Sequence, residues 1–406
     1  GEQGICCRIC AMGPCRITPK APRGVCGCDA HGIVGRNFLK FTAGGAATHS
    51  DHGREICHTL YCAKEGGNYQ VKDPEKLLRI AKEWGVETEG KDIYDLAHEM
   101  AELGLMEYGK PFGYQRFLDR MPAGQKEKLI ENEIAPRAID REVASSLHMT
   151  HMGCSSLPEA LVKQSLRCGL ADGWGGSMMG TEFSDVLFGT PKPIETEANL
   201  GVMNAENVNI VVHGHDPSLS EMICEVADSK EMIDYAKSMG AKGITISGVC
   251  CTSNEVAMRR GIPMAGNFLQ QENVVLTGAC EAIVVDVQCI FPALGPLSKC
   301  FHTKFITTSP ICQMPDSEFI EFSAGTAGEK ARQIVKLACE NFKNRKPDLV
   351  YIPDMKQKAT VGYSVEAIVK TLDGVTNSQV DETGTTKPLL ECITSGVIRG
   401  AVAMVG

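Results

Sequence analysis

The spacing of apolar and polar residues divides the chain into two parts. Across residues 37–167, apolar side chains recur every three or four positions with charged side chains between them, which is typical of amphipathic helices. From residue 207 onward, short β-branched runs alternate with helical stretches, which indicates βαβ units and a mainly parallel sheet. The strands expected there are 208–212, 243–247, 274–276, 282–287, 305–307, 349–352 and 400–405. The helices expected between them are 218–239, 254–260 and 364–371.

The pattern predicts an α/β fold class, with a helical N-terminal domain followed by parallel-sheet domains. We assign a cysteine-rich loop and the helical domain to residues 1–195, one α/β domain to 196–347, and the start of a second α/β domain to 348–406. This last part has fewer than 60 residues, ends in an apolar run, and is too short to bury a core alone. Because the chain also begins at Gly1 rather than Met, we expect the sequence to be truncated at both ends.

Composition excludes several classes of protein. The 406 residues are 43% hydrophobic and 22% charged, as in an ordinary folded protein. The net charge is −9, so no basic surface for nucleic acid is expected. No apolar run approaches the roughly 18 residues of a membrane span. The 19 cysteines of this long chain indicate metal or iron–sulfur ligation in a reduced, cytoplasmic compartment rather than a disulfide scaffold.

The first 26 residues contain a cluster of cysteines. Its members are Cys6, Cys7, Cys10, Cys15 and Cys26. Four thiolates in one short loop, punctuated by glycine and proline, can converge on a [4Fe–4S] cluster. A zinc ribbon is the alternative, but it normally uses two Cys-x2-Cys pairs and this segment has one. We therefore favour an iron–sulfur cluster, which leaves Cys6 for another role nearby, such as a subunit contact.

Three of the expected strands run directly into residues that bind metals. The residues at these strand ends are His213 and His215, Cys250 and Cys251, and Cys289. Because ligands of an open parallel sheet bind beyond the carboxyl ends of its strands, these side chains are expected at one edge. A single cysteine after a strand is more often a small buried residue, but three such strand ends favour a metal centre. Imidazole and thiolate ligands together suit zinc, iron or nickel.

Ionisable side chains recur at every third position of one expected helix, at His49, His52, Glu55 and His58. Each step of three residues falls about 60° short of a full turn, so the four groups form a slowly winding ribbon. Neighbours on it can pass a proton, directly or through a water, and imidazole does so near neutral pH. The alternative is a polar helix face that happens to hold histidines. Three of the chain's ten histidines lie within these ten residues, which slightly favours the proton relay.

At these residues the sequence resembles the catalytic subunit of the nickel-dependent carbon monoxide dehydrogenases. The matching motifs follow the family order over nearly the whole chain and together are highly specific. They are C-C-x2-C-x4-C from residue 6, H-S-D-H-G-R at 49–54, H-G-H-x-P at 213–217, C-C-T-x-N-E-V at 250–256, M-R-R-G-I-P at 258–263 and D-x-Q-C-I at 286–290. The resemblance implies a helical domain followed by two Rossmann-like α/β domains, in a homodimer.

The resemblance also implies three metal sites. Its ligands for a [4Fe–4S] cluster are Cys7, Cys10, Cys15 and Cys26. Its ligands for a nickel–iron–sulfur active centre are His215, Cys251 and Cys289, with three more cysteines expected beyond Gly406. The resemblance makes Cys6 one of two cysteines per chain that hold a dimer-bridging iron–sulfur cluster.

The activity implied by the resemblance is the interconversion of CO and water with CO2, two protons and two electrons, by an anaerobic oxidoreductase of the Wood–Ljungdahl pathway. His49 and His52 would serve in proton transfer, and Asp172 would orient the catalytic groups. Electrons would leave through the [4Fe–4S] clusters to a ferredoxin-like carrier, and an acetyl-CoA synthase subunit is a candidate partner. The alternatives are an iron–sulfur reductase of the hybrid-cluster type and a non-catalytic electron-transfer subunit.

Overall fold

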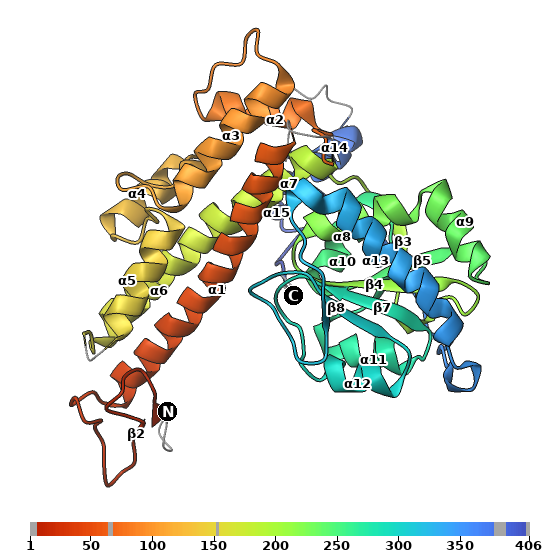
Figure 1. The fold of residues 1–406 in the computed structure, drawn as a ribbon. Coiled ribbons are helices and arrows are strands. Elements are labelled where there is room, and N and C mark those ends of the chain that lie inside the picture. Colours follow the sequence, from red (N-terminus) through yellow and green to blue (C-terminus); the bar gives the residue numbers. More distant parts are fainter. Residues whose placement is uncertain (1–5, 64–67, 152–153, 377–386, 403–406) are drawn as a thin grey trace. The chain divides into compact units, whose positions relative to one another are not determined.

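The computed structural model describes residues 6–63, 68–151, 154–376 and 387–402. The chain forms two compact units, of which one comprises residues 1–189 with 323–327 and the other comprises 190–322 with 328–406. The first unit is helical, and the second contains an eight-stranded sheet (Figure 1). None of the helices in the described ranges is both long enough and apolar enough to span a membrane.

The first unit is built around one long helix, α1. Its elements are the strands β1 (Cys6–Cys7) and β2 (Cys15–Arg16), the helices α1 (Ala30–Cys62), α2 (Pro74–Glu83), α3 (Ile93–Tyr108), α4 (Ala123–Glu131), α5 (Ile139–Thr150), α6 (Pro158–Ala171) and α7 (Met178–Phe188), the 3-10 helices η1 (Arg116–Arg120) and η5 (Ala324–Thr326), and the π-helical turn η2 (Asp172–Ser177). α1 packs against α3, α5, α6 and α7 (Figure 1). The helical character expected for this part of the chain is confirmed.

The start of α1 follows from its sequence. The Asp29 side chain accepts a hydrogen bond from Gly32 N at 2.9 Å, which satisfies one of the backbone donors that a helix leaves unpaired in its first turn. Farther along, Ile33, Leu39 and Ile56 are fully buried. Because helices in proteins are stabilised mainly by packing of an apolar face, these contacts hold the 33-residue helix in place.

Glycines let α1 approach the π-helical turn closely. A Cβ atom on Gly53 would lie 2.2 Å from Tyr108 Oη and 2.7 Å from Gly176 O. A Cβ atom on Gly176 would in turn lie 2.6 Å from His49 O. A side chain at either position would force α1 and η2 apart, so glycine is required where the two backbones meet. This contact explains the glycine of the H-S-D-H-G-R motif.

We expect Gly53→Ala to destabilise the protein although alanine is the better helix former. Alanine gains about 1 kcal/mol over glycine in a helix, whereas overpacking costs about 1–3 kcal/mol, and the atoms that Gly53 faces include a backbone carbonyl. Gly44→Ala on the same helix is the control, because nothing lies within 4 Å of its Cβ position. Thermal unfolding should give a lower Tm for Gly53→Ala and an equal or higher Tm for Gly44→Ala. A Tm for Gly53→Ala at or above that of the wild type would contradict the close approach.

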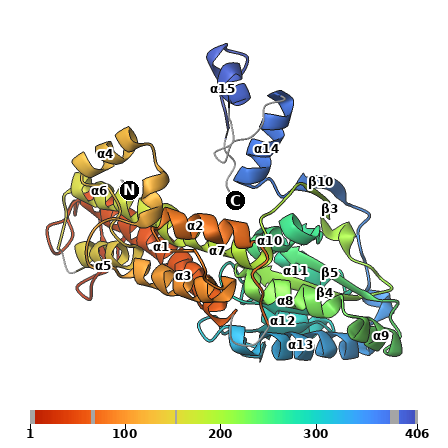
Figure 2. The same cartoon turned by 90° about the horizontal axis from the view of Figure 1, so that it is seen from above.

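The second unit contains a sheet of eight strands, whose order is β10-β3-β6-β5-β4-β7-β8-β9. Its strands are β3 (Ile194–Ala198), β4 (Val208–Gly214), β5 (Ile244–Val249), β6 (Met264–Gly266), β7 (Cys280–Val285), β8 (Lys304–Thr307), β9 (Glu318–Phe319) and β10 (Gln357–Val361). All neighbours pair in parallel except β10, which pairs with β3 in the antiparallel sense at one edge (Figure 2).

Helices cover both faces of this sheet. The helices of the second unit are α8 (Pro217–Ala227), α9 (Lys230–Ser238), α10 (Cys250–Arg260), α11 (Gln271–Leu276), α12 (Leu294–Cys300), α13 (Ala327–Asn341), α14 (Val365–Thr376) and α15 (Lys387–Thr394), with the 3-10 helices η3 (Leu200–Val202), η4 (Phe268–Gln270), η6 (Phe342–Asn344) and η7 (Pro347–Leu349). Of these, α14 and α15 extend away from the sheet (Figure 2). α11 and α12 lie on one side of the sheet, and α8 and α13 lie on the other (Figure 1). The predicted α/β fold class is confirmed, and the expected strands 208–212, 243–247, 282–287 and 305–307 correspond to β4, β5, β7 and β8.

Two expected strands in the middle of this unit are wrong. Residues 274–276 belong to α11, in which Val274 and Val275 pack into the core beneath the sheet. A short apolar run does not distinguish a buried strand from a buried helix, so the pattern was ambiguous there. Leu349 is the last residue of η7, and residues 350–352 join no strand. Tyr351 is 73% exposed, and its N–H donates to the carbonyl oxygen of Thr277, just after α11.

The expected final strand is also wrong as far as the structure describes it. Residues 395–402 form turns and irregular chain, and Val397 is 76% exposed, so the apolar run lies at the surface of this unit. Residues 403–406 lie outside the described part. The residues after 348 add β10 to the sheet of the second unit. The proposed domain boundaries after residues 195 and 347 stay predictions.

Candidate metal centres

Cysteines of the N-terminal loop line one cavity of about 150 Å³. The strand pair β1–β2 sets Cys7 opposite Cys15. The cysteines that line the cavity are Cys7, Cys10, Cys15, Cys26 and Cys28, and all are free thiols. One water molecule needs only about 15 Å³ of such space, so the cavity has room for a group of several atoms. The backbone of Cys6 forms part of β1, and its side chain lies outside the described part.

This cavity fits a multinuclear cluster better than a single ion. A [4Fe–4S] cluster takes four cysteine thiolates around a core of several atoms, whereas zinc draws four ligands to within about 2.3 Å of one point. In the described part of the chain, no three His, Cys, Asp or Glu side chains gather closely enough to hold one metal ion. The number of thiols and the space are compatible with the iron–sulfur interpretation, which stays a prediction.

Two of the cavity sulfurs accept hydrogen bonds. Val25 N donates to Cys15 Sγ at 3.5 Å, and Arg36 Nη1 donates to Cys26 Sγ at 3.6 Å. The bond from Arg36 lowers the pKa of the Cys26 thiol and so favours the thiolate that ligates metals, whereas burial raises the pKa of Cys28. Sequence reasoning gave neither Arg36 nor Cys28 a role. The Cys-x-Cys spacing of Cys26 and Cys28 was a usable signal, but nothing in the spacing marks Arg36.

Three neighbouring strands of the second unit end in imidazole and thiol side chains, as the sequence predicted. β5, β4 and β7 lie side by side and lead into Cys251, His215 and Cys289, respectively. Cys250 and Cys251 open α10, and their Sγ atoms are 4.0 Å apart. The Cys250 and Cys289 side chains are close enough for each to influence the pKa of the other. The fold therefore gathers sulfur atoms from two separate strand ends.

The backbone and the acidities of these cysteines are unusual. Cys250, Gln288 and Cys289 have φ values of 68°, 71° and 58°, a left-handed conformation that is uncommon outside glycine and is found often at functional sites. The hydrogen bond from Cys250 lowers the pKa of Cys251, and the same bond raises the pKa of Cys250 itself. Burial raises the pKa of Cys289. Cys251 is therefore the thiol of this group most disposed to become a thiolate.

Asp286 links the ends of β4 and β7 through hydrogen bonds. Its carboxylate accepts hydrogen bonds from His215 N at 2.7 Å and Asp216 N at 2.9 Å, and another from Val287 N. The side chain is buried, and burial raises its pKa well above the usual range, with a further contribution from Asp216. A Cβ atom on Gly214 would lie 1.7 Å from Asp286 Oδ1, and the φ of Gly214 is +132°. Only glycine fits between the two histidines of the H-G-H motif.

His213 and His215 occupy different environments. His213 is 1% exposed, its Nε2 lies 3.0 Å from Gln271 Oε1, and burial lowers its pKa. Gln271 Nε2 donates to Cys289 O at 2.9 Å, so this one amide links β4, α11 and the loop after β7. His215 lies at the strand end itself and is partly exposed, with its backbone held by Asp286. Gln271 was missed because it begins a helix that the sequence did not predict.

The first unit contains a histidine–carboxylate pair. His49 Nδ1 lies 2.7 Å from Asp172 Oδ1, and Ser177 Oγ donates to the same carboxylate oxygen at 2.9 Å. Asp172 and Ser177 are the two ends of η2, and π-helical turns are frequent at functional sites. The hydrogen bond to Asp172 raises the pKa of His49. A carboxylate on one ring nitrogen orients the imidazole so that the other nitrogen can transfer a proton.

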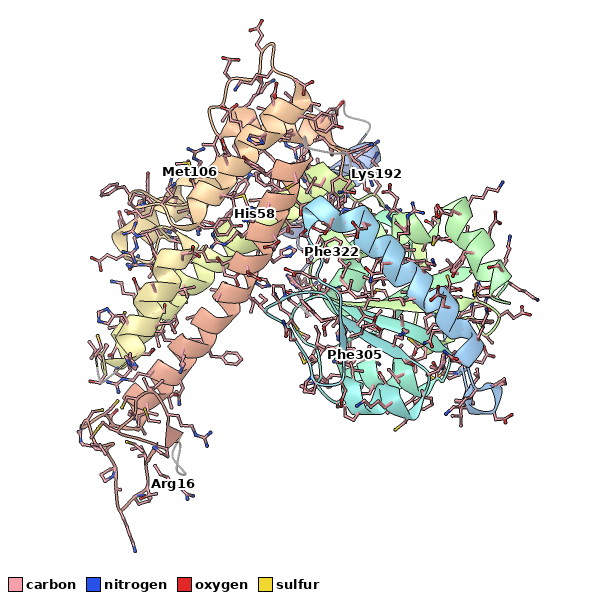
Figure 3. All side chains as sticks on the ribbon, viewed as in Figure 1. Arg16, His58, Met106, Lys192, Phe305 and Phe322 are labelled. Atoms are coloured by element: carbon pink, nitrogen blue, oxygen red, sulfur yellow. The ribbon has the colours of Figure 1, made fainter. Side chains whose placement is uncertain are left out.

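The other members of the ribbon pass from the interior to the surface along α1. His52 is buried, whereas Glu55 and His58 are exposed. The winding of about 60° per step accounts for this change of environment. Figure 3 shows Arg16 of the cysteine loop near one end of α1 and His58 farther along the helix. The structure joins His49 to Asp172 directly, and the relay through the remaining members stays a prediction.

Comparison with known families matches residues 5–406 to one described as Prismane/CO dehydrogenase. The chain belongs to this family. A member from Methanosarcina mazei, named carbon monoxide dehydrogenase 1, is 46% identical over 411 residues, which cover 100% of this chain and 64% of that protein. Another, from Moorella thermoacetica, is named subunit beta of carbon monoxide dehydrogenase/acetyl-CoA synthase and is 41% identical over 382 residues, covering 92% of this chain and 56% of that protein.

A solved structure of the family agrees with the fold. The as-isolated, nickel-free carbon monoxide dehydrogenase from Thermococcus sp. AM4 superposes with a TM-score of 0.92 and 48% identity, over 98% of this chain and 62% of that chain. The family resemblance inferred from the motifs is confirmed. The chain spans less than two thirds of the length of these family members.

We expect Gly214→Ala to lower the free energy of unfolding of the protein by about 3 kcal/mol or more, because a steric clash adds to backbone strain. Gly240→Ala is the matched control: its φ is +102°, but nothing lies within 4 Å of its Cβ position, so it shows the strain alone. Urea unfolding of both variants measures the difference. Equal losses in the two variants would argue against the tight contact between Gly214 and Asp286.

We expect the pKa of His49 to lie above 6.5 and to fall in Asp172→Asn, because that change removes the negative charge that stabilises the imidazolium. Since the folded pKa is raised, the pair stabilises the protein below the pKa of unfolded histidine, and this stabilisation is lost as the pH rises through the folded value. NMR titration of the ring protons measures both forms. His58 on the same helix, whose pKa is lowered by partial burial and by the Arg54 charge, is the internal control and should not shift. An unchanged His49 titration in the variant would count against the pair.

Proposed function

We propose that the protein containing this chain interconverts CO and water with CO2, two protons and two electrons at a nickel–iron–sulfur centre. Family membership across residues 5–406 supports this proposal, as do relatives named carbon monoxide dehydrogenase at 46% and 48% identity. The observation that carries it is that three adjacent strands, β5, β4 and β7, end in two thiols and an imidazole at one edge of the sheet.

His215, Cys251 and Cys289 would hold the active centre. When bound, such a centre supplies a soft, sulfur-ligated metal for CO and a Lewis acid that activates water. Asp286 fixes the backbone of His215, and Gln271 fixes the carbonyl group of Cys289. Since metal sites depend on partners that orient their ligands, these two side chains are part of the site although they do not ligate.

His49 would take up and release protons, with Asp172 orienting its ring. The reaction releases two protons for each CO oxidised, so it needs a base close to neutral pH. Asp172 orients the His49 ring through Nδ1 and raises its pKa, which lets Nε2 take up and release a proton in this range. His52, one step along the ribbon, would receive the proton next. Glu55 and His58 would then deliver it to solvent, since both are exposed.

The cysteine loop would carry electrons. Cys7, Cys10, Cys15 and Cys26 would hold a [4Fe–4S] cluster, which passes single electrons without rearranging the protein. Cys6 would share a bridging iron–sulfur cluster with a second copy of the chain in a homodimer. From there, electrons would reach a ferredoxin-like carrier in an anaerobic cytoplasm.

Two helices of the first unit offer surface for a second copy of the chain. Val34, Phe38 and Phe41 form an exposed apolar row on α1, and Val162 and Leu166 form another on α6. Exposed rows of this kind mark contact surfaces.

The relative from Moorella thermoacetica is named for a complex with acetyl-CoA synthase. A subunit of that kind is a candidate partner here.

We expect anaerobically purified protein to contain nickel and to reduce methyl viologen in the presence of CO. Cys289→Ser should lose the nickel and at least about 99% of the activity, because a ligand of the centre is removed. Cys300→Ser is the matched control, since it makes the same change at an exposed thiol on α12 that belongs to no site. Its nickel content and rate should equal those of the wild type.

Two outcomes would replace this proposal. Iron without nickel, together with reduction of hydroxylamine, would indicate a hybrid-cluster reductase. Iron–sulfur clusters without nickel and without turnover of either substrate would indicate an electron-transfer subunit. Equal nickel content in Cys289→Ser and Cys300→Ser would remove Cys289 from the centre.

A further inference from the structure

We infer that Arg36 supplies the positive charge that balances the cluster of the cysteine loop and thereby raises its reduction potential. The inference rests on the proposed function, because it requires an iron–sulfur cluster in the cavity lined by Cys7, Cys10, Cys15 and Cys26. It adds a residue that tunes the cluster without ligating it.

Arg36 is a buried cation at the wall of this cavity. It lies in the second turn of α1, is 2% exposed, and lines the cavity together with the cysteines. A guanidinium stays protonated in proteins, so this charge is permanent. The cavity wall is otherwise apolar side chains, glycine backbone and thiols.

The partners of Arg36 in the structure are a carbonyl group and sulfur atoms. Nε donates to Ser155 O, and Nη1 donates to Cys26 Sγ at 3.6 Å. Cys7, Cys26 and Cys28 line the same cavity wall, so their sulfur atoms are the groups near Arg36 that could carry negative charge. Among the described residues, no Asp or Glu carboxylate forms an ion pair with it.

A buried guanidinium without a counter-charge is strongly unfavourable. Thiolates at this cavity would provide that counter-charge, and four of them on one cluster provide it permanently. The cluster becomes more negative by one charge when it accepts an electron. A fixed positive charge nearby therefore stabilises the reduced form more than the oxidised form, and a hydrogen bond to a ligand sulfur acts in the same direction.

The guanidinium is held in one orientation by its surroundings. A Cβ atom on Gly32 would lie 2.7 Å from Ser156 O and 2.5 Å from Cys28 Sγ, so the segment before α6 packs directly on the first turn of α1. This packing presents Ser155 O to Nε and leaves Nη1 directed at Cys26. Since Arg36 is preorganised in this way, its charge acts on the cluster at a fixed position.

The test compares Arg36→Gln, Arg36→Lys and the control Arg23→Gln in anaerobically purified protein. Arg23 lies in the same loop, but it is exposed and donates to Gly27 O at 2.8 Å rather than to sulfur. Iron and acid-labile sulfide are measured first. The potential is then measured by EPR-monitored redox titration of the signal that is lost in Cys10→Ala.

Arg36→Gln should lower the midpoint potential by an amount equal to about a tenfold change in the ratio of reduced to oxidised cluster, or about 59 mV for one electron. Arg36→Lys keeps the charge and should shift the potential by less than half as much. Arg23→Gln should not shift it. An unchanged potential in Arg36→Gln, or equal shifts in the glutamine and lysine variants, would overturn the inference.

The iron content of the same variants, which reports cluster assembly, is a second test. If Arg36→Gln does not retain iron, retention in Arg36→Lys supports the need for the charge, and loss in both variants overturns it in favour of packing. Zinc without iron in the loop of the wild-type protein would instead defeat the cluster assignment itself, before any Arg36 variant is considered.

Discussion

One buried carboxylate organises the edge of the sheet on which the candidate active centre depends. Asp286 follows β7, yet it binds the backbone N–H groups of His215 and Asp216 after β4, so two strand ends share one anchor. Because burial makes an unpaired carboxylate costly, these donors are needed for the fold as well as for the site. Gly214 is the consequence, since its Cβ position is occupied by the carboxylate. The glycine of the H-G-H motif is therefore required because the sheet edge has no room for a side chain at this position.

Much of this edge could be predicted from the sequence because central parallel strands are buried on both faces and appear as continuous apolar runs. β4 and β7 are fully buried and were found in this way. β3 and β10 lie at one edge of the sheet and pair mainly with each other. They carry the charged residues Glu195, Glu197 and Lys358, so no apolar run in the sequence predicted them. α11 was taken for a strand because two adjacent valines fit either element.

Side chains that act through other residues were the hardest to find. Asp172 was reached only through the family resemblance, because its partner His49 is 123 residues away. Gln271 and Arg36 belong to no spacing pattern, and only the fold brings them to Cys289 and Cys26. Candidate ligands could be proposed from the sequence because imidazole and thiol side chains have specific chemistry and follow either a short cysteine spacing or the end of an expected strand; as ligands they stay predictions. Residues that orient or balance those ligands are distant in sequence and can be almost any polar type.

α1 joins the two functions assigned to the first unit. Its second turn carries Arg36 at the cysteine loop, and thirteen residues later it carries His49, about 20 Å away along the helix axis. The close approach of α1 to η2, which Gly53 and Gly176 permit, then sets His49 against Asp172. One helix would thus fix the positions of the proposed electron site and the proposed proton site while keeping them apart.

The central claim is that His215, Cys251 and Cys289 bind one nickel-containing core. Anomalous X-ray scattering from crystals of the anaerobically purified protein, recorded on both sides of the nickel absorption edge, tests it most directly. The claim predicts a nickel peak within bonding distance of a core that these three side chains ligate. A nickel peak elsewhere, or three side chains that contact no metal while the crystals contain nickel, would contradict it.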